Sequence, residues 1–183
     1  MVAAWYNAVQ NSGTATGAVK SSLLHFLASV SSDNQAAAHL AASGPASDLE
    51  IRIRRKFERQ HFMHLIGADL TVITPGRVEA ELALQQQHQQ QRGFAHGGLV
   101  ATMADLVAGF AAVTLIPDNC GLVTADLRVS YLHPGVGQRL RAVGWVLKAG
   151  RRLHFCEAEV WCDELLIAKA SATMAVVEPA PQP

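Results

Sequence analysis

The residues best suited to chemistry lie in one segment near the middle of the chain. From Gly97 to Ile116 the sequence is almost entirely apolar and contains a single charged residue, Asp105. A carboxylate in such a segment is costly to bury unless it has a partner or a function. Because a carboxylate can remove a proton from water, Asp105 is a candidate general base.

The start of the same segment, His96-Gly97-Gly98, suits the binding of a carbonyl oxygen. The first N–H groups of a helix have no partner within it and carry a partial positive charge. Two glycines allow a ligand to come close to this backbone. A helix that begins here can therefore stabilise the negative oxygen that forms when a nucleophile attacks a carbonyl group.

The spacing separates these two features along the helix. Asp105 follows Gly98 by seven residues. That is about two turns, or roughly 10 Å along the axis, so one helix cannot bring both features to one small carbonyl group. An Asp105 from a second copy, packed antiparallel alongside, can reach it. We therefore expect a site shared by two copies of the chain.

The flanking sequence predicts the elements that position these residues. Ser47-Asp48-Leu49-Glu50 has the spacing of a capping box, and apolar residues then recur at helical spacing, which predicts one helix from Ser47 to Gly67. Alternating residues around Thr74-Pro75-Gly76-Arg77 predict a β-hairpin. The glutamine-rich run 85–91 is interpreted as a strand end and loop. The central helix is expected from Gly97 to Leu115, before a proline.

Four strands are expected after the central helix. In the first, Ala125, Leu127, Val129 and Tyr131 alternate with polar residues and are expected on one face. Short turns join the four segments, which favours an antiparallel sheet. Such a sheet buries one face, and the apolar helix is the element it can wrap, so the expected fold class is α+β. The expected strands are 122–132, 140–148, 153–162 and 165–177.

Composition narrows the range of functions. The 183 residues carry a formal net charge of zero, so the overall charge attracts neither nucleic acid nor an anionic membrane. Three cysteines without a Cys-x-x-Cys pair indicate reduced thiols and a cytoplasmic protein. The run from Gly97 to Ile116 is long enough to span a bilayer, but Asp105 near its centre would cost about 3 kcal/mol there. We therefore expect no nucleic-acid partner and no membrane segment.

The chain is expected to form one domain with two flanking segments. Residues 1–47 are rich in Ala, Ser, Asn and Gly and are interpreted as an N-terminal extension, with the domain at 48–178 and a tail at 179–183. His61 and His64 lie three residues apart in the first predicted helix, but no cysteine or carboxylate set accompanies them. We therefore expect no metal site.

Several of these residues together resemble a known family. The pattern Gly93-x-x-His96-Gly97-Gly98, then Asp105, is followed by Thr124-x-Asp126, Tyr131-Leu132-x-Pro134 and Gly150-Arg151. This pattern is similar to that of the hotdog-fold acyl-CoA thioesterases, in the branch of the phenylacetic-acid-pathway thioesterase and thioesterase-superfamily member 2. The resemblance covers residues 57–177. It implies a curved antiparallel sheet around a central helix, and two protomers that pair into one continuous sheet.

The resemblance also implies roles for particular residues. The Gly97 N–H polarises the thioester carbonyl, and Asp105 of the partner protomer acts as a general base on water or as a nucleophile. Thr124 helps to hold the water. His96 and Gln90 line the acyl or carbonyl site, and relatives often carry Asn in place of Gln90. The CoA portion of the substrate is expected to contact Gly98, Lys148, Arg151 and Arg152.

Each of these residues also has an interpretation without catalysis. Asp105 can be a buried group bonded to a backbone N–H, His96 a helix cap, and Thr124 a common strand former. Two other functions stay open at this point: a hotdog hydratase or dehydratase acting on acyl thioesters, and a protein that binds acyl-CoA without hydrolysing it. The expected function is hydrolysis of acyl-CoA by a homodimer or homotetramer, with no cofactor other than the CoA of the substrate.

Overall fold

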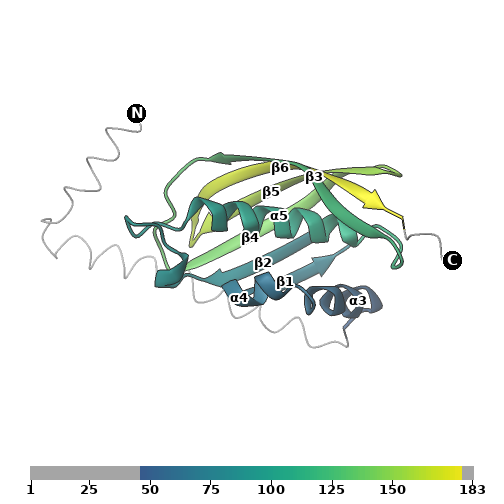
Figure 1. Ribbon diagram of the computed structural model, residues 1–183, viewed down its shortest axis with the longest axis horizontal. Helices are drawn as coiled ribbons and strands as arrows, with labels where there is room; N and C mark the ends of the chain where they lie inside the picture. The colour runs from purple at the N-terminus through teal and green to yellow at the C-terminus, as the bar shows by residue number, and fades with distance from the viewer. Residues whose placement is uncertain (1–45, 179–183) are drawn as a thin grey trace, which may run out of the picture. The chain divides into compact units, whose positions relative to one another are not determined.

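A six-stranded antiparallel sheet curves around one long helix, α5 (Gly97–Val113), in the computed structural model, which describes residues 46–178 (Figure 1). The strands follow the order β1-β2-β4-β5-β6-β3, so β1 and β3 form the two edges. The predicted α+β fold class, a curved sheet around an apolar helix, is confirmed. The strands are β1 (Ala68–Thr74), β2 (Arg77–Ala83), β3 (Gly121–Tyr131), β4 (Arg139–Ala149), β5 (Leu153–Cys162) and β6 (Leu165–Val177).

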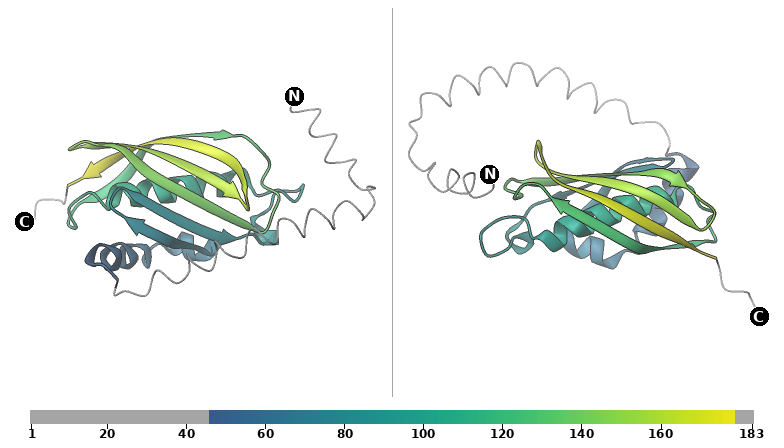
Figure 2. Two further views of the ribbon diagram at one scale, coloured as in Figure 1. Left: turned by 180° about the vertical axis from the view of Figure 1, so that it is seen from behind. Right: turned by 90° about the horizontal axis from the view of Figure 1, so that it is seen from above.

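The sheet buries α5 along most of its length. Ten of the 17 helix residues are buried, and they are distributed around the helix instead of along one stripe. Figure 2 shows the strands covering the helix from one side and curling around it. A helix that is apolar all round needs apolar surface on every side, which the curved sheet supplies. The predicted central helix is confirmed, although it ends at Val113 and not at Leu115.

The segment predicted as one helix forms two, which corrects the prediction. α3 (Asp48–Phe57) and α4 (His61–Ile66) lie against β1 at one edge of the sheet. Between them the chain forms a turn of the 3-10 type, in which the Arg59 N–H donates to the Lys56 carbonyl, three residues back. Residues 58–60 are exposed, so no packing holds a continuous helix there.

Both predicted ends of this segment are confirmed. Ser47 Oγ accepts a hydrogen bond from the Glu50 N–H at 3.1 Å and caps α3. The Glu50 carboxylate does not return to Ser47, as a full capping box requires, but accepts from the Arg54 guanidinium at 2.9 Å. Gly67 ends α4 in the left-handed conformation, with φ of 72°.

The predicted hairpin is confirmed, and it is anchored to the end of α5. Pro75-Gly76 joins β1 to β2, and Gly76 has φ of 72°. The Gly76 N–H donates to Thr114 Oγ1 at 2.7 Å, and this hydroxyl donates to the Ala111 carbonyl at 2.6 Å. One threonine side chain thus ties the hairpin to the C-terminal turn of α5.

A β-bulge in β3 changes which of its residues face α5. Consecutive residues of β6 lie opposite Thr124 and Asp126, so Ala125 is an extra residue in the strand. Simple alternation predicts that Ala125 shares a face with Leu127 and that Thr124 points away. This prediction is wrong at Ala125, which is exposed, because the extra residue shifts the alternation by one. Thr124 and Leu127 therefore both face the helix.

The glutamine-rich run contains a short 3-10 helix in addition to the predicted loop. In this helix, η2 (Gln86–His88), the His88 ring is buried and its Nδ1 accepts a hydrogen bond from the Gln85 N–H at 3.1 Å. The His88 carbonyl accepts from the His96 N–H at 2.8 Å. The run thus fixes the position of the chain just before α5 begins.

No helix within residues 46–178 is both long and apolar enough to cross a membrane. The predicted extension, 1–47, lies outside the described residues apart from Ala46 and Ser47, and so does the tail, 179–183. The division of the chain into these segments and a domain at 48–178 therefore stays a prediction.

Two glycines allow a matched test of the core packing. A Cβ at Gly144 of β4 would overlap the backbone of Val107 and Ala108 in α5, whereas a Cβ at Gly109 of α5 would meet no atom within 4 Å. We expect Gly144→Ala to lower the free energy of unfolding by about 1–3 kcal/mol through overpacking. Gly109→Ala should raise it by about 0.5–1 kcal/mol, because alanine favours a helix more than glycine does.

Urea unfolding at one fixed protein concentration measures both variants. A Gly144→Ala protein as stable as the wild type would contradict the close approach of β4 to α5.

Candidate active site

His96 caps the N-terminus of α5. Its Nδ1 accepts a hydrogen bond from the Gly98 N–H at 3.0 Å, so Nδ1 carries no proton in this arrangement. The ring itself is exposed. A Cβ at Gly98 would lie only 3.0 Å from His96 Nδ1, which explains the glycine at that position. The interpretation of His96 as a helix cap is confirmed, and its contact with a substrate stays a prediction.

Gly97 presents the open backbone donor at this helix start. The Gly98 N–H is engaged by His96, whereas the Gly97 N–H has no acceptor among residues 46–178. On the other side of the same residue, the Tyr131 hydroxyl donates to the Gly97 carbonyl at 2.8 Å. A Cβ on Gly97 would lie 3.6 Å from the tyrosine ring. The donor therefore belongs to a backbone segment whose position is fixed from both sides.

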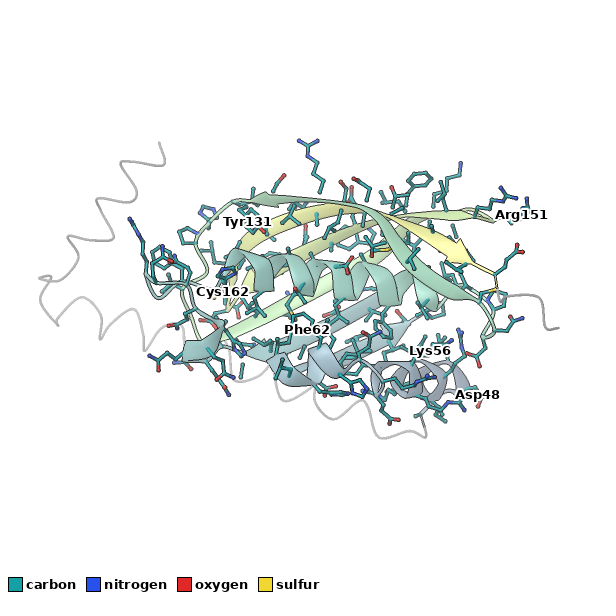
Figure 3. The ribbon with its side chains drawn as sticks, viewed as in Figure 1. Asp48, Lys56, Phe62, Tyr131, Arg151 and Cys162 are labelled. Atoms are coloured by element: carbon teal, nitrogen blue, oxygen red, sulfur yellow. The ribbon has the colours of Figure 1, made fainter. Side chains whose placement is uncertain are left out.

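Tyr131 is a site residue that the sequence analysis did not assign. Figure 3 shows it close to the start of α5, and its side chain is 56% exposed in the single chain. From the sequence, Tyr131 was expected on the inner face of its strand, without a role of its own in the site. The available signal was the motif Tyr131-Leu132-x-Pro134, in which a tyrosine precedes the chain turn at the end of β3.

Asp105 is half-buried and is held by one hydroxyl group. Thr124 Oγ1 donates to Asp105 Oδ1 at 2.8 Å. The contact exists because the bulge at Ala125 turns Thr124 toward α5. In the part of the chain that the structure describes, no group donates to Asp105 Oδ2. One carboxylate oxygen is thus available to accept a proton from water, as the predicted role of Asp105 requires.

Asp105 and Thr124 line a pocket of about 460 Å³ between α5, β3 and the α3–α4 turn. Its size lies within the range of small-molecule binding sites. Its wall combines apolar and polar side chains, and the polar ones besides Asp105 and Thr124 come from α3 and the turn after it. The apolar lining includes Met63, Leu106, Gly109, Phe110, Val113 and Leu122, and the polar lining includes Lys56, Arg59 and Gln60.

Gly97 and Asp105 do not meet within one chain. They lie eight residues apart on α5. This spacing corresponds to about 12 Å along a rigid helix axis. Of the other predicted site residues, His96 belongs to the helix start and Thr124 to the group around Asp105. The single chain therefore holds two separate groups of candidate residues, one at the helix start and one around Asp105, which we call half-sites.

The remaining predicted residues lie in two other places. Gln90 is in the loop before α5, where its Oε1 accepts from the Arg92 N–H at 2.7 Å. Arg151 lies at the opposite end of the sheet from Tyr131 (Figure 3). Lys148 and Arg152 flank it at the β4–β5 turn. Within one chain, these three basic residues are remote from the helix start.

Burial shifts the pKa values of two cysteines and one histidine in the core. Desolvation raises the pKa of the Cys156 thiol to about 11, and desolvation together with the Asp163 charge raises the pKa of Cys162. Desolvation lowers the pKa of His154, which favours its neutral form. Since none of the three lines the pocket around Asp105, we assign them to the core.

Comparisons with known proteins identify the family of the chain. A family model described as the thioesterase superfamily matches residues 92–168, which include both half-sites. A putative esterase of Caenorhabditis elegans, F42H10.6, is 30% identical over 131 residues, covering 69% of this chain and 77% of that protein. The chain belongs to the thioesterase superfamily. Another relative, the medium/long-chain acyl-CoA thioesterase YigI of Escherichia coli K12, is 34% identical over 115 residues, covering 53% of this chain and 74% of that protein.

Solved structures share this fold. A thioesterase family protein from Silicibacter pomeroyi matches with a TM-score of 0.68 and 31% identity, covering 71% of this chain and 98% of that one. The Escherichia coli PaaI protein from the phenylacetic acid degradation operon matches in fold, with a TM-score of 0.66 at 16% identity. The predicted family, the hotdog thioesterases, and the predicted enzyme class, a thioester hydrolase, are confirmed.

The cysteines differ in accessibility in a way that can mark the pocket. Cys120 lines the pocket and is half-exposed, whereas Cys156 and Cys162 are buried. We expect one of the three thiols to react quickly with a disulfide reagent in the native protein near neutral pH. The other two should react only on unfolding. Cys120→Ser should remove the fast reaction, and two fast thiols in the native protein would contradict the burial described above.

Proposed function

We propose that this chain hydrolyses acyl-CoA thioesters at a site shared by two protomers. The observation that supports this most directly is the Asp105 carboxylate, oriented by Thr124 in the wall of the pocket. The relatives named acyl-CoA thioesterases, YigI among them and a human one called acyl-coenzyme A thioesterase 13, support the choice of substrate. The reaction needs a polarised carbonyl and an activated water, and each half-site suits one of these tasks.

The exposed edge strand β3 supports the pairing of two protomers. This strand is 11 residues long, and every one of its residues is at least partly exposed. A long unpaired edge with apolar side chains such as Val123 favours association with another strand. Two β3 strands related by a twofold axis near Asp126 would pair antiparallel and continue the sheet. The Thr124 end of one strand would then lie beside the Tyr131 end of the other.

This pairing would complete the site. Tyr131 donates a hydrogen bond to Gly97, and Thr124 donates one to Asp105. One half-site therefore lies next to each end of β3. Antiparallel pairing brings the Gly97 half-site of one protomer to the Asp105 half-site of its partner, twice per dimer. The basic turn at Arg151 lies at the opposite end of its sheet from Tyr131. The same pairing would therefore bring that turn toward the Gly97 half-site of the partner.

The proposed reaction uses only side chains, backbone and water. The Gly97 N–H donates to the thioester carbonyl oxygen while Asp105 of the partner removes a proton from water. The resulting oxygen attacks the carbonyl carbon, the C–S bond breaks, and the CoA sulfur receives the proton. The products are a carboxylic acid and free CoA, and no cofactor is required besides the CoA of the substrate.

Direct attack by the Asp105 carboxylate is the competing route, through an anhydride that water then opens. A single turnover in ¹⁸O-water separates the two routes. The general-base route places the label only in the released acid, whereas water attack on the aspartyl carbon of an anhydride leaves it in the protein.

The first test of the proposal is Asp105→Asn. The substitution is nearly isosteric and keeps a Thr124 partner, so the protein should fold. Loss of a general base should reduce kcat for thiol release from acyl-CoA by about 10²–10⁴-fold. Asp48→Asn, at an exposed position at the start of α3, is the matched control and should keep wild-type turnover. A fully active Asp105→Asn enzyme would exclude the proposed base.

No release of thiol by the wild type from any acyl-CoA would contradict the hydrolase. A change in the acyl group without thiol release would instead favour a hydratase or dehydratase.

The second test asks whether one site uses two chains. Asp105→Asn and Gly97→Val each damage one half-site, so each homodimer should be inactive. A hybrid dimer carries both lesions in one site and none in the other. Dissociation and mixing of equal amounts should restore up to about a quarter of wild-type activity by simple counting. Absence of recovery despite subunit exchange shown by mass spectrometry, or an active monomer, would contradict the shared site.

A further inference from the structure

Gly109 occupies a position on α5 where glycine has a cost. It lies in the interior of the helix, four residues beyond Asp105. Glycine in a helix interior is less stable than alanine, since it loses more backbone entropy and buries no side chain. The other small residues nearby, Ala108, Ala111 and Ala112, are buried alanines, so α5 otherwise uses the better helix former where space is short.

Packing does not explain this glycine. A Cβ added at Gly109 would meet no atom within 4 Å, so alanine would fit without a clash. Gly144 shows the contrast, because there a Cβ would overlap the backbone of α5. The open space beside Gly109 is the pocket that Asp105 also lines. The missing side chain therefore enlarges that pocket.

The pocket continues from Asp105 along the surface of α5. Phe110 and Val113 belong to the helix wall, Leu122 to the β3 wall, and Met63 to α4 on the facing side. The Lys56 ammonium group, which also lines the pocket, is paired with the Asp118 carboxylate at 3.0 Å. An apolar ligand can thus occupy the space beside Gly109 without leaving that ammonium group unpaired.

The geometry points to Gly109 as the residue that sets the depth of the acyl-binding pocket, in the protomer that supplies Asp105. The inference rests on the proposed function. The thioester carbonyl would lie at Asp105, and the acyl chain would run past it over Gly109. Four residues of helix are about 6 Å, which an extended alkyl chain spans with about five carbons. The substrate class is therefore an apolar aliphatic acyl group longer than this, whereas an acetyl group would not reach Gly109.

The experiment measures kcat/KM for thiol release with straight-chain acyl-CoA esters from acetyl to dodecanoyl. The variants are Gly109→Ala and Gly109→Leu. The ratio of kcat/KM for decanoyl-CoA to that for acetyl-CoA should fall at least about tenfold in Gly109→Leu, because methylene-sized changes in an apolar pocket have effects of that order. Gly109→Ala should lower the ratio less. In the Gly109→Leu background, Leu122→Ala removes volume from the β3 wall of the pocket. It should restore part of the kcat/KM ratio of decanoyl-CoA to acetyl-CoA.

The stability of the variants separates this role from a structural one. Gly109→Ala should unfold at a higher urea concentration than the wild type while its preference for long chains falls. A Gly109→Ala protein that is less stable than the wild type would show that glycine is needed for packing. An equal loss of kcat/KM for all chain lengths in Gly109→Leu would show that the space holds the pantetheine arm or none of the ligand. Either result would overturn the inference.

A binding measurement keeps the inference testable if hydrolysis is absent. Cys120 lines the same pocket, so the rate at which iodoacetamide alkylates it reports occupancy. A decyl thioether of CoA, which cannot be hydrolysed, should slow this alkylation in the wild type at least about tenfold at saturation. CoA alone should not, and Gly109→Leu should lose the protection. Equal protection by CoA would overturn the inference, whereas protection by the thioether without any hydrolysis would contradict only the proposed function.

Discussion

The structure depends on one helix that has apolar residues on all sides. α5 cannot contribute a polar face to solvent, so the sheet has to curve around it, and β1, β2, β4, β5, β6 and β3 successively cover its surface. Chemistry is possible only where this cover stops. It stops at the helix start, where Gly97 is half-exposed, and along the side next to the edge strand β3, where Asp105 lines a pocket. Because a helix is rigid, these two openings stay about 12 Å apart, and each can supply only part of a hydrolytic site.

The edge strand β3 links both openings to the sheet. Thr124 near one end donates to Asp105, and Tyr131 at the other end donates to the Gly97 carbonyl. Both side chains face inward only because Ala125 is an extra residue between them. Without the bulge, a strand that keeps Tyr131 on the inner face would direct Thr124 outward, since alternate residues point to opposite faces. A single inserted residue thus lets one strand contact α5 at both Gly97 and Asp105.

The sequence was sufficient for much of the fold, because strong periodicity and turn residues identify long elements. It predicted the hairpin at Pro75-Gly76, the central helix from Gly97 and the strands 153–162 and 165–177. It did not predict the bulge in β3. Simple alternation of inward and outward side chains places Ala125 on the face of Leu127, and nothing in the sequence marks Ala125 as an extra residue. The break between α3 and α4 was also missed, because apolar residues recur from Ile53 and Phe57 to the run 62–66 with no glycine or proline between them. For the candidate site, residue types and spacing led to the prediction of Asp105 and Gly97, whereas the hydrogen bond from Tyr131 depends on tertiary geometry.

Glycine has opposite roles at different positions of this core, and the sequence alone cannot distinguish them. At Gly144 the absence of a side chain lets β4 approach the backbone of α5, which is a packing requirement. At Gly97 and Gly109 the neighbouring atoms are 3.6 Å away or farther than 4 Å, so packing makes no such demand. There the missing side chains leave a backbone N–H accessible and a pocket open. Gly97 and Gly109 both belong to α5, so the lower helix stability that glycine causes is confined to this helix. α5 also has ten buried residues. Burial of these residues offsets the local cost, so the helix that organises the core can also be the helix that carries the site.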